Sequence, residues 1–326
     1  MRPFAFLAPT TLTEALQLLD ATSGEAHLIA GGSDLLAVLK DEVVHYERLV
    51  SLEGIEELRH IRQNGDGLRL GAGVTLTQLE YEPRLQGPYR ILSEAARSVA
   101  IPEIRHQGTL GGNLCQRPRC LHYRSALTPC MKKGGTDCPA LNSPYQAYLS
   151  IMGGHGCFSV HASDLAPPLM ALGAHVTLAA PEGERSLPLE LFFVGPEVVV
   201  QRENVLTHNE ILTAVTLPAM PAEWRGTYLK ARERSAGDFP LVSVAVGYGL
   251  TSGGIQQARV VLGGVAPTPW RSPEAEAVLE GQTPAPELAA RAATAALAQA
   301  APLHHNAFKV DIGLALVARA IMTLAT

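Results

Sequence analysis

Apolar and polar positions near the N-terminus alternate between helical and strand periods. Leu12, Ala15, Leu16 and Leu19 recur on one helical face, and Thr11 with Glu14 forms a capping box before them. Strands are predicted at 27–30, 49–52 and 68–70, and helices at 35–39, from 75–78 onward and at 91–100.

The pattern changes in the second half of the chain. A hairpin is predicted from 176–180 and 185–187, and a strand at 211–217 ends at Pro218. The segment 218–221 is the best linker candidate. Beyond it, strands at 228–232, 242–250 and 258–263 have antiparallel spacing, and long apolar helices are predicted at 286–300 and 308–324. This order predicts a C-terminal domain in which helices cover a sheet.

Composition narrows the class of protein. Apolar residues make up 47% and charged residues 17% of the 326 residues, which is typical of a globular protein. The net charge of -5 and the lack of a basic stripe argue against nucleic acid as a partner. No apolar run approaches the roughly 18 residues of a spanning helix. The first residues lack the long apolar segment of a signal peptide.

A glycine pair follows the predicted strand at 27–30. Gly31 and Gly32 would let the backbone approach a ligand closely, and the N–H groups of such a turn suit a pyrophosphate. The alternative is a tight turn without a ligand. A second glycine segment runs from Gly108 to Leu114.

All five cysteines lie between positions 115 and 157. The surrounding run is rich in Pro, Gly and Arg and cannot bury a core of its own, so something must cross-link it. Metal ligands are favoured over disulfides in a chain without a leader. Four thiolates suit an iron–sulfur cluster; a zinc site or unpaired buried thiols are the alternatives, although the close C-x-x-C pairs of zinc sites do not occur.

No catalytic constellation is visible in the sequence. Five of the seven histidines in the first half are scattered without a nucleophile or carboxylate at a telling spacing, namely His27, His106, His122, His155 and His161. We therefore expect no catalytic residue in this chain and substrate chemistry elsewhere.

Four motifs together resemble the flavin-binding medium subunit of the xanthine dehydrogenase or molybdenum hydroxylase family. They are Ala30–Leu35, Gly108–Leu114, Ser163-Asp164-Leu165 and Lys230 within Tyr228–Arg232. The resemblance covers the whole chain. It implies an α/β and α+β fold: a two-part FAD-binding region of the PCMH/vanillyl-alcohol-oxidase type at 1–218, with parts 1–55 and 56–218, and a C-terminal flavoprotein domain at 222–326 with a small antiparallel sheet.

An insert of about forty residues, at about 115–158, separates the second glycine segment from Ser163-Asp164. It is similar to the inserts of two subclasses that hold an extra [4Fe-4S] cluster, the periplasmic aldehyde oxidoreductases and 4-hydroxybenzoyl-CoA reductase. The runs 116–120, 263–266 and 269–271 look closer to the aldehyde oxidoreductases. The expected cluster ligands are Cys120, Cys130, Cys138 and Cys157, and Cys115 is expected to be a small buried residue.

The resemblance also assigns the flavin contacts. It gives the pyrophosphate to both glycine turns, a hydrogen-bond acceptor role to Asp164, and a place near the ring to Lys230 and Leu212. A helix cap, a solvated lysine and an ordinary core residue are the respective alternatives. The predicted cofactor-binding residues are Leu28, Ile29, Ala30, Gly31, Gly32, Ser33, Asp34, Leu35, Thr109, Leu110, Gly111, Gly112, Asn113, Asp164, Leu212 and Lys230.

By resemblance, the chain is an electron-transfer subunit carrying FAD and one [4Fe-4S] cluster in a molybdenum-dependent hydroxylase, an aldehyde oxidoreductase or xanthine dehydrogenase-like complex. A large subunit with the molybdenum cofactor and a small subunit with two [2Fe-2S] clusters are its expected partners. Alternative functions are a subunit of an aromatic acyl-CoA reductase, a stand-alone flavin oxidase and a zinc-stabilised assembly module. We expect the cytoplasm as its compartment; the alternative is the periplasm, reached with a partner that carries the export signal.

Overall fold

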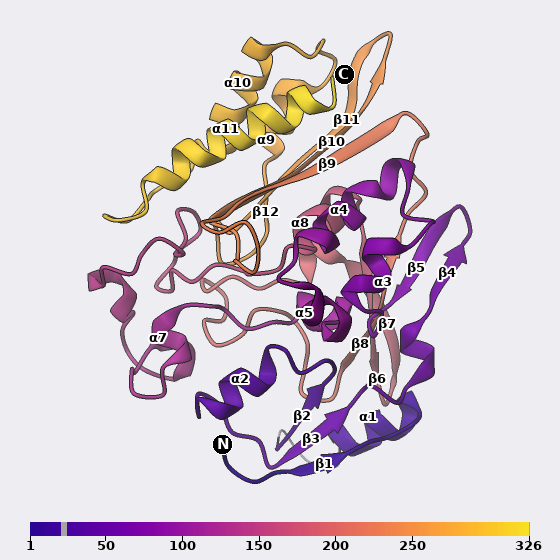
Figure 1. The fold of residues 1–326 in the computed structure, drawn as a ribbon, viewed down its shortest axis with the longest axis vertical. Coiled ribbons are helices and arrows are strands. Elements are labelled where there is room, and N and C mark those ends of the chain that lie inside the picture. The colour runs from indigo at the N-terminus through magenta and orange to yellow at the C-terminus, as the bar shows by residue number, and fades with distance from the viewer. Residues whose placement is uncertain (21–24, 326) are drawn as a thin grey trace.

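A computed structural model of the protein describes residues 1–20 and 25–325. Within them the chain forms three sheets. Figure 1 shows the N-terminal sheet at one end of the molecule, the four-stranded sheet with the C-terminal helices at the other, and the five-stranded sheet between them. The predicted mixture of α/β and α+β parts, with a small C-terminal antiparallel sheet, is confirmed.

The N-terminal sheet is parallel and has the strand order β1-β3-β2. Neighbouring residues of a strand point to opposite faces, so Val50 packs with the first helix while Leu49 packs with the second. The helix predicted at Thr11 and the short helix after the first glycine pair are both present. The elements are β1 (Ala5–Leu7), α1 (Leu12–Asp20), β2 (Ala26–Ile29), α2 (Leu35–Lys40) and β3 (Arg48–Ser51).

The middle sheet is antiparallel with the order β4-β5-β8-β6-β7. One of its faces belongs to the main core, where Leu70 and Val215 pair across neighbouring strands. The predicted cap at Thr75 is a complete capping box with Gln78. The strands are β4 (Ile61–Asn64), β5 (Gly67–Gly71), β6 (His175–Ala180), β7 (Gly183–Pro188) and β8 (Ile211–Leu217); the helices are α3 (Leu76–Tyr81), α4 (Arg90–Ser98), α5 (Pro102–Gln107), α6 (Leu110–Leu114) and α8 (Ala166–Ala171).

The C-terminal sheet is antiparallel with the order β12-β11-β10-β9. Val244 and Val246 pack with the three C-terminal helices, whereas Ala245 between them joins the main core with Tyr228. This sheet is therefore covered on both faces. Its elements are β9 (Trp224–Ala231), β10 (Val242–Thr251), β11 (Gly254–Gly263), β12 (Trp270–Arg271), α9 (Pro273–Leu279), α10 (Pro286–Ala296) and α11 (Phe308–Thr323).

The insert, residues 115–158, contains no strand and only short helical turns. It lies along one side of the molecule, where α7 is labelled in Figure 1. Its end is held by α11, because the buried Lys309 Nζ donates to the carbonyl oxygens of Leu149 (2.7 Å) and Gly264 (2.6 Å). The helical turns are α7 (Leu121–Arg124), η3 (Met131–Lys133) and η4 (Pro139–Asn142); those outside the insert are η1 (Glu56–Arg59), η2 (Gly87–Tyr89) and η5 (Leu189–Leu191).

None of the helices in the described ranges is long and apolar enough to cross a membrane.

One ion pair connects the β6–β7 hairpin to the residue that precedes β8. Arg185 donates from Nε and Nη2 to the two carboxylate oxygens of Glu210, at 2.6 and 2.9 Å. These hydrogen bonds lower the pKa of Glu210 to about 2. A carboxyl group whose pKa is lowered by folding stabilises the protein at pH values above its pKa in the unfolded chain, here about 4.5. This stabilisation is lost as the pH falls towards the folded-state pKa of about 2.

We therefore predict that Glu210→Gln lowers the free energy of unfolding at pH 7 by about 1 kcal/mol, a modest value because Arg185 is half exposed. The difference from the wild type shrinks as the pH is lowered from 4.5 towards 2. Urea unfolding at pH 7, 4.5 and 3 measures it. Glu184→Gln, on the exposed edge of the same hairpin, is the control; a Glu210→Gln difference independent of pH contradicts the assignment.

Candidate functional site

The first glycine turn connects β2 to α2. Gly32 has a φ of 68°, a left-handed conformation that favours glycine, and its carbonyl oxygen accepts from the N–H of Leu36 at 3.0 Å. The N–H groups of Gly32, Ser33, Asp34 and Leu35 donate to no acceptor in the described part of the chain. Four backbone donors thus remain at one turn, with the Ser33 side chain exposed beside them.

The second glycine segment is a short helix, α6, and not only the turn that its sequence suggested. Thr109 is its N-cap and accepts from the Gly112 N–H at 3.1 Å. The N–H groups of Leu110 and Gly111 donate to Val74 and Ala72 at 2.8 Å each. Gly111 sits against Ala72, whereas a β-carbon on Gly112 would meet only the Thr109 hydroxyl within 4 Å. The amides of this segment are therefore bound within the protein, and Gly112 is its exposed point.

The fold brings the two glycine segments into contact. A β-carbon on Gly31 would lie 1.8 Å from the carbonyl oxygen of Gln107, directly before Gly108 and Thr109. Only glycine permits this approach of two backbones. Two glycine segments more than seventy residues apart in the sequence thus contact each other at Gly31.

Asn113 connects the second glycine segment to the Ser-Asp motif. Its amide oxygen accepts from Ser163 Oγ at 2.5 Å, and the same hydroxyl accepts from the Ala166 N–H at 3.0 Å. Ser163 thus binds the first N–H of α8, whose N-cap position is Leu165 and has no side-chain cap. Asp164, for which a helix cap was the alternative role, does not cap α8.

Asp164 and Lys230 meet in a buried ion pair. Lys230 Nζ lies 2.8 Å from Asp164 Oδ2, and the two side chains are 4% and 3% exposed. Tyr228 donates its hydroxyl to the other carboxylate oxygen at 2.5 Å, and Lys230 also donates to the Ser98 carbonyl oxygen at 3.2 Å. Burial, then the charge of Asp164, raises the pKa of Tyr228 well above its usual value, so Tyr228 is a fixed donor.

The remaining predicted flavin residues lie in regular structure. Leu110 and Leu212 are buried in the main core, with Leu212 on β8 opposite Leu178. Leu28 and Ile29 lie on β2, Ala30 follows them, and Leu35 begins α2.

Asp34 turns away from the free N–H groups of its own turn. Its carboxylate accepts from the Arg117 backbone N–H at 2.8 Å and from Arg124 Nη2 at 2.6 Å, and it lies 3.0 Å from Arg119 Nη2. All three partners belong to the insert. This connection across more than eighty residues has no sequence signal.

Four of the five cysteines line one small cavity of about 20 Å³ in the insert. They are the four predicted metal ligands, Cys120, Cys130, Cys138 and Cys157, accompanied by His122, Met131 and Lys132. Burial raises the pKa of the Cys120 and Cys138 thiols, and the other thiols of the cavity raise it further. Within the described residues, no three His, Cys, Asp or Glu side chains are close enough together to hold a single metal ion.

Cys115 lies outside this cavity. It packs against the main core, where burial raises the pKa of its thiol to about 12. The structure thus separates the same cysteine from the other four as the sequence did.

Glu203 is a buried residue that the sequence analysis missed. Its carboxylate lies 2.7 Å from Lys132 Nζ, beside the cysteine cavity, and 3.1 Å from Arg117 Nε. It comes from an irregular segment between η5 and β8, where no periodicity or motif marks it.

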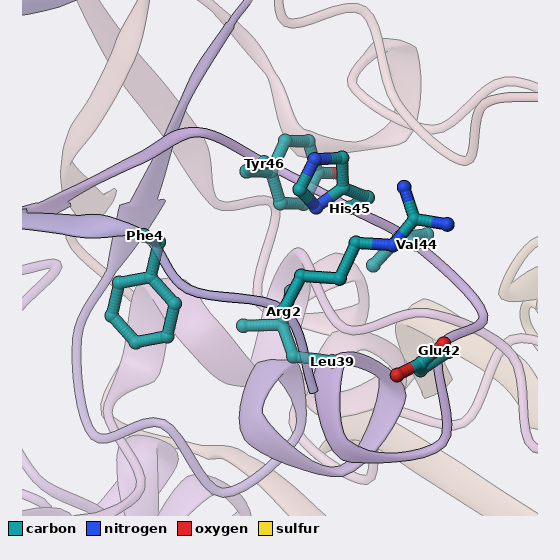
Figure 2. Close-up of a pocket in the computed structure, with 7 residues that line it drawn as sticks. All are labelled: Arg2, Phe4, Leu39, Glu42, Val44, His45 and Tyr46. Atoms are coloured by element: carbon teal, nitrogen blue, oxygen red, sulfur yellow. The ribbon is translucent and has the colours of Figure 1, made fainter.

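A second small cavity, of about 30 Å³, lies beside α2 near the N-terminus. Figure 2 shows Arg2 reaching towards His45 and Val44, with Glu42 below it. Glu42 pairs with the N-terminal amino group at 3.0 Å. None of the predicted site residues lines this cavity, so it adds nothing to the flavin or cysteine sites.

Comparison with known proteins decides the family. The family model described as the FAD binding domain in molybdopterin dehydrogenase matches residues 2–220. The chain belongs to this family. A second model, the CO dehydrogenase flavoprotein C-terminal domain, matches residues 227–324. The predicted membership in the flavin subunits of the xanthine dehydrogenase and molybdenum hydroxylase family is confirmed.

Individual relatives agree with the family models. The aldehyde oxidoreductase FAD-binding subunit PaoB of Escherichia coli K12 is 34% identical over 86% of this chain and 86% of its own length. The putative xanthine dehydrogenase FAD-binding subunit XdhB of the same organism is 31% identical over 82% of this chain and 75% of its own. A structure of carbon monoxide dehydrogenase from Hydrogenophaga pseudoflava, lacking the Mo-pyranopterin moiety of the molybdenum cofactor, has a TM-score of 0.79 at 28% identity, covering 100% of this chain and 98% of that one.

The first glycine turn fits the FAD that the family binds. Its free N–H groups are donors suited to a pyrophosphate, and Gly31 and Gly32 keep side chains out of the turn. When bound, FAD supplies one- and two-electron transfer.

We predict that Lys230→Met lowers the free energy of unfolding by about 3–5 kcal/mol, because it leaves Asp164 buried without a counter-charge. The double variant with Asp164→Asn recovers part of this loss. Denaturant unfolding measures both. Arg90→Met, which removes an exposed pair with Glu94, is the control and costs less than about 1 kcal/mol; equal losses in the Lys230 and Arg90 variants would contradict a buried pair.

Proposed function

We propose that this chain is the FAD- and [4Fe-4S]-carrying electron-transfer subunit of a molybdenum-dependent aldehyde oxidoreductase. The observation that supports the cluster is the convergence of Cys120, Cys130, Cys138 and Cys157 on one cavity, with Cys115 left outside. The 34% identity to the FAD-binding subunit of an aldehyde oxidoreductase supports the substrate class.

The donor set suits iron more than zinc. A [4Fe-4S] cluster takes one thiolate at each of four irons, so its ligands stand further apart than the four around a single tetrahedral ion. The cavity gathers four thiols, one for each iron of such a cluster. Their raised pKa values mean that binding metal releases protons from Cys120 and Cys138.

The pyrophosphate of FAD is assigned to the N–H groups of Gly32 to Leu35. Ser33 and Thr109 add hydroxyl groups, and Asn113 adds an amide beside them. The resemblance places Asp164, Leu212 and Lys230 towards the ring, and the Asp164–Lys230 contact is consistent with their acting together.

The partners in this proposal are a large subunit that holds the molybdenum cofactor and a small [2Fe-2S] subunit. With this chain they form a heterotrimer. Substrate oxidation takes place on the large subunit. The compartment is the cytoplasm unless a partner's signal exports the folded complex. Fractionating cells that express this chain with and without its partners tests that point.

The first prediction concerns cofactor content. This chain, produced with its partners, separated from them and handled without oxygen, releases FAD on denaturation and contains about four iron and four sulfide, as one cluster requires. Serine in place of Cys120, Cys130, Cys138 or Cys157 lowers the iron content, whereas the matched control Cys115→Ser leaves it unchanged. Zinc in place of iron supports the assembly-module alternative. An intact cluster in Cys157→Ser together with loss in Cys115→Ser reverses the ligand choice.

The second prediction concerns activity. The purified chain alone is expected to oxidise neither aldehydes nor purines, because the proposal places substrate oxidation on the large subunit. The complex with both partners oxidises aldehydes. Turnover by the isolated chain supports the flavin oxidase alternative, and reduction of an aromatic acyl-CoA by the complex supports the reductase alternative.

A further inference from the structure

Helix α2 contacts both the first glycine turn, here called the flavin turn (residues 31–35), and the cavity lined by the four cysteines. The turn of free N–H groups leads directly into it at Leu35. Its buried Val38 packs with Tyr123 and Cys130 of the insert, and Cys120 lies at the edge of the same apolar cluster. A helix of six residues is too short to hold its conformation alone, so its position depends on this packing.

The Asp34 carboxylate adds a polar connection at the start of α2. Arg124 donates to Asp34 from Nη2 and to the Pro118 carbonyl oxygen from Nε, at 2.6 and 2.8 Å, while the Arg117 N–H donates to the other Asp34 oxygen. Asp34 makes no hydrogen bond that caps α2. The last residue of the flavin turn is thus held by the segment that carries the first cluster cysteine.

The insert has little regular structure of its own. Its helical turns have four residues at most, and it contains no strand. Without a bound group, the four thiols of the cavity make no disulfide. Cys120 lies between Arg117 and Arg124, so a group bound by its thiol would constrain the segment that holds Asp34.

We infer that Asp34 is a positioning residue that couples the two cofactor sites, so that FAD binding and cluster binding stabilise each other. The inference rests on the cluster in the proposed function. Its carboxylate does not contact FAD; it fixes the glycine turn through the arginines of the insert. Coupling of this kind is reciprocal, so each cofactor strengthens the binding of the other by the same factor.

The test measures the dissociation constant of FAD for the purified full-length chain, from the quenching of flavin fluorescence. Asp34→Asn and Arg124→Gln are each expected to weaken FAD binding about tenfold, and the double variant no more than either single variant. Arg185→Gln, which breaks an ion pair on the distant hairpin, is the matched control and leaves the affinity unchanged. Arg124→Lys replaces Arg124→Gln if the latter does not fold.

The second measurement separates coupling from a general structural role. Removing iron from the wild type with a chelator is expected to weaken FAD binding about tenfold and to have no further effect in Asp34→Asn. In the reverse direction, bound FAD slows the release of iron to the chelator in the wild type and not in the variant.

Two results would overturn the inference. The first is an FAD affinity that is equal with and without iron in the wild type. The second is a loss in Asp34→Asn alone with Arg124→Gln harmless, because this pattern means that Asp34 contacts FAD directly. If the chain holds no iron at all, the cluster of the proposed function is refuted instead. The Asp34–Arg124 cycle, which needs no iron, then decides: non-additive losses support the link between turn and insert, and additive losses refute it.

Discussion

The placement of the insert depends on two carboxylates that lie outside it. Asp34 forms ion pairs with Arg119 and Arg124 and accepts a hydrogen bond from the backbone N–H of Arg117. Glu203 forms ion pairs with Lys132 and with the side chain of Arg117. A cation as buried as Lys132, which is 5% exposed, is costly unless it is paired. Moving this irregular segment away from Asp34 and Glu203 would leave these charges without their partners. Charge pairing therefore helps to hold the insert in the position in which Cys130 packs against Val38 of α2.

The fold also brings the two glycine segments, which are far apart in the sequence, close together. The parallel sheet delivers the first glycine turn, and the approach of Gly31 to the backbone of Gln107 delivers the second. The insert then leaves directly from α6 and returns across α2 before it reaches Ser163 and Asp164. Its far end is tied to α11 through Lys309 and Leu149. The insert is thus anchored on the first and the last parts of the chain.

Much of this architecture was predictable because periodicity reports burial. The spacing of Leu12 to Leu19 predicted α1, and the alternation in 242–250 predicted β10. The cysteines were predictable as a set because their sequence surroundings exclude a core. Helix α8 was raised only through the alternative role of Asp164 as a helix cap, because Ala166–Ala171 is wholly buried, shows no polar face and has prolines at its second and third positions. Strand β4 was not predicted because it is a mostly exposed edge strand. The pairing of Asp34 and Glu203 with the insert could not be read either, since it joins charges in segments that share no motif.

The Asp164–Lys230 pair changes what the site offers a neighbouring group. The family resemblance gave Lys230 a place near the flavin ring, and its ammonium is 2.8 Å from a carboxylate that also accepts from Tyr228. The pair has no net charge when both members are ionised, so its field is that of a dipole fixed by β9 and the start of α8. A fixed dipole costs no reorganisation when charge develops beside it, and in a buried site its effect is larger than in water. Neutralising Lys230 would therefore expose the negative charge of Asp164, and its effect on a nearby anion would exceed the loss of one positive charge.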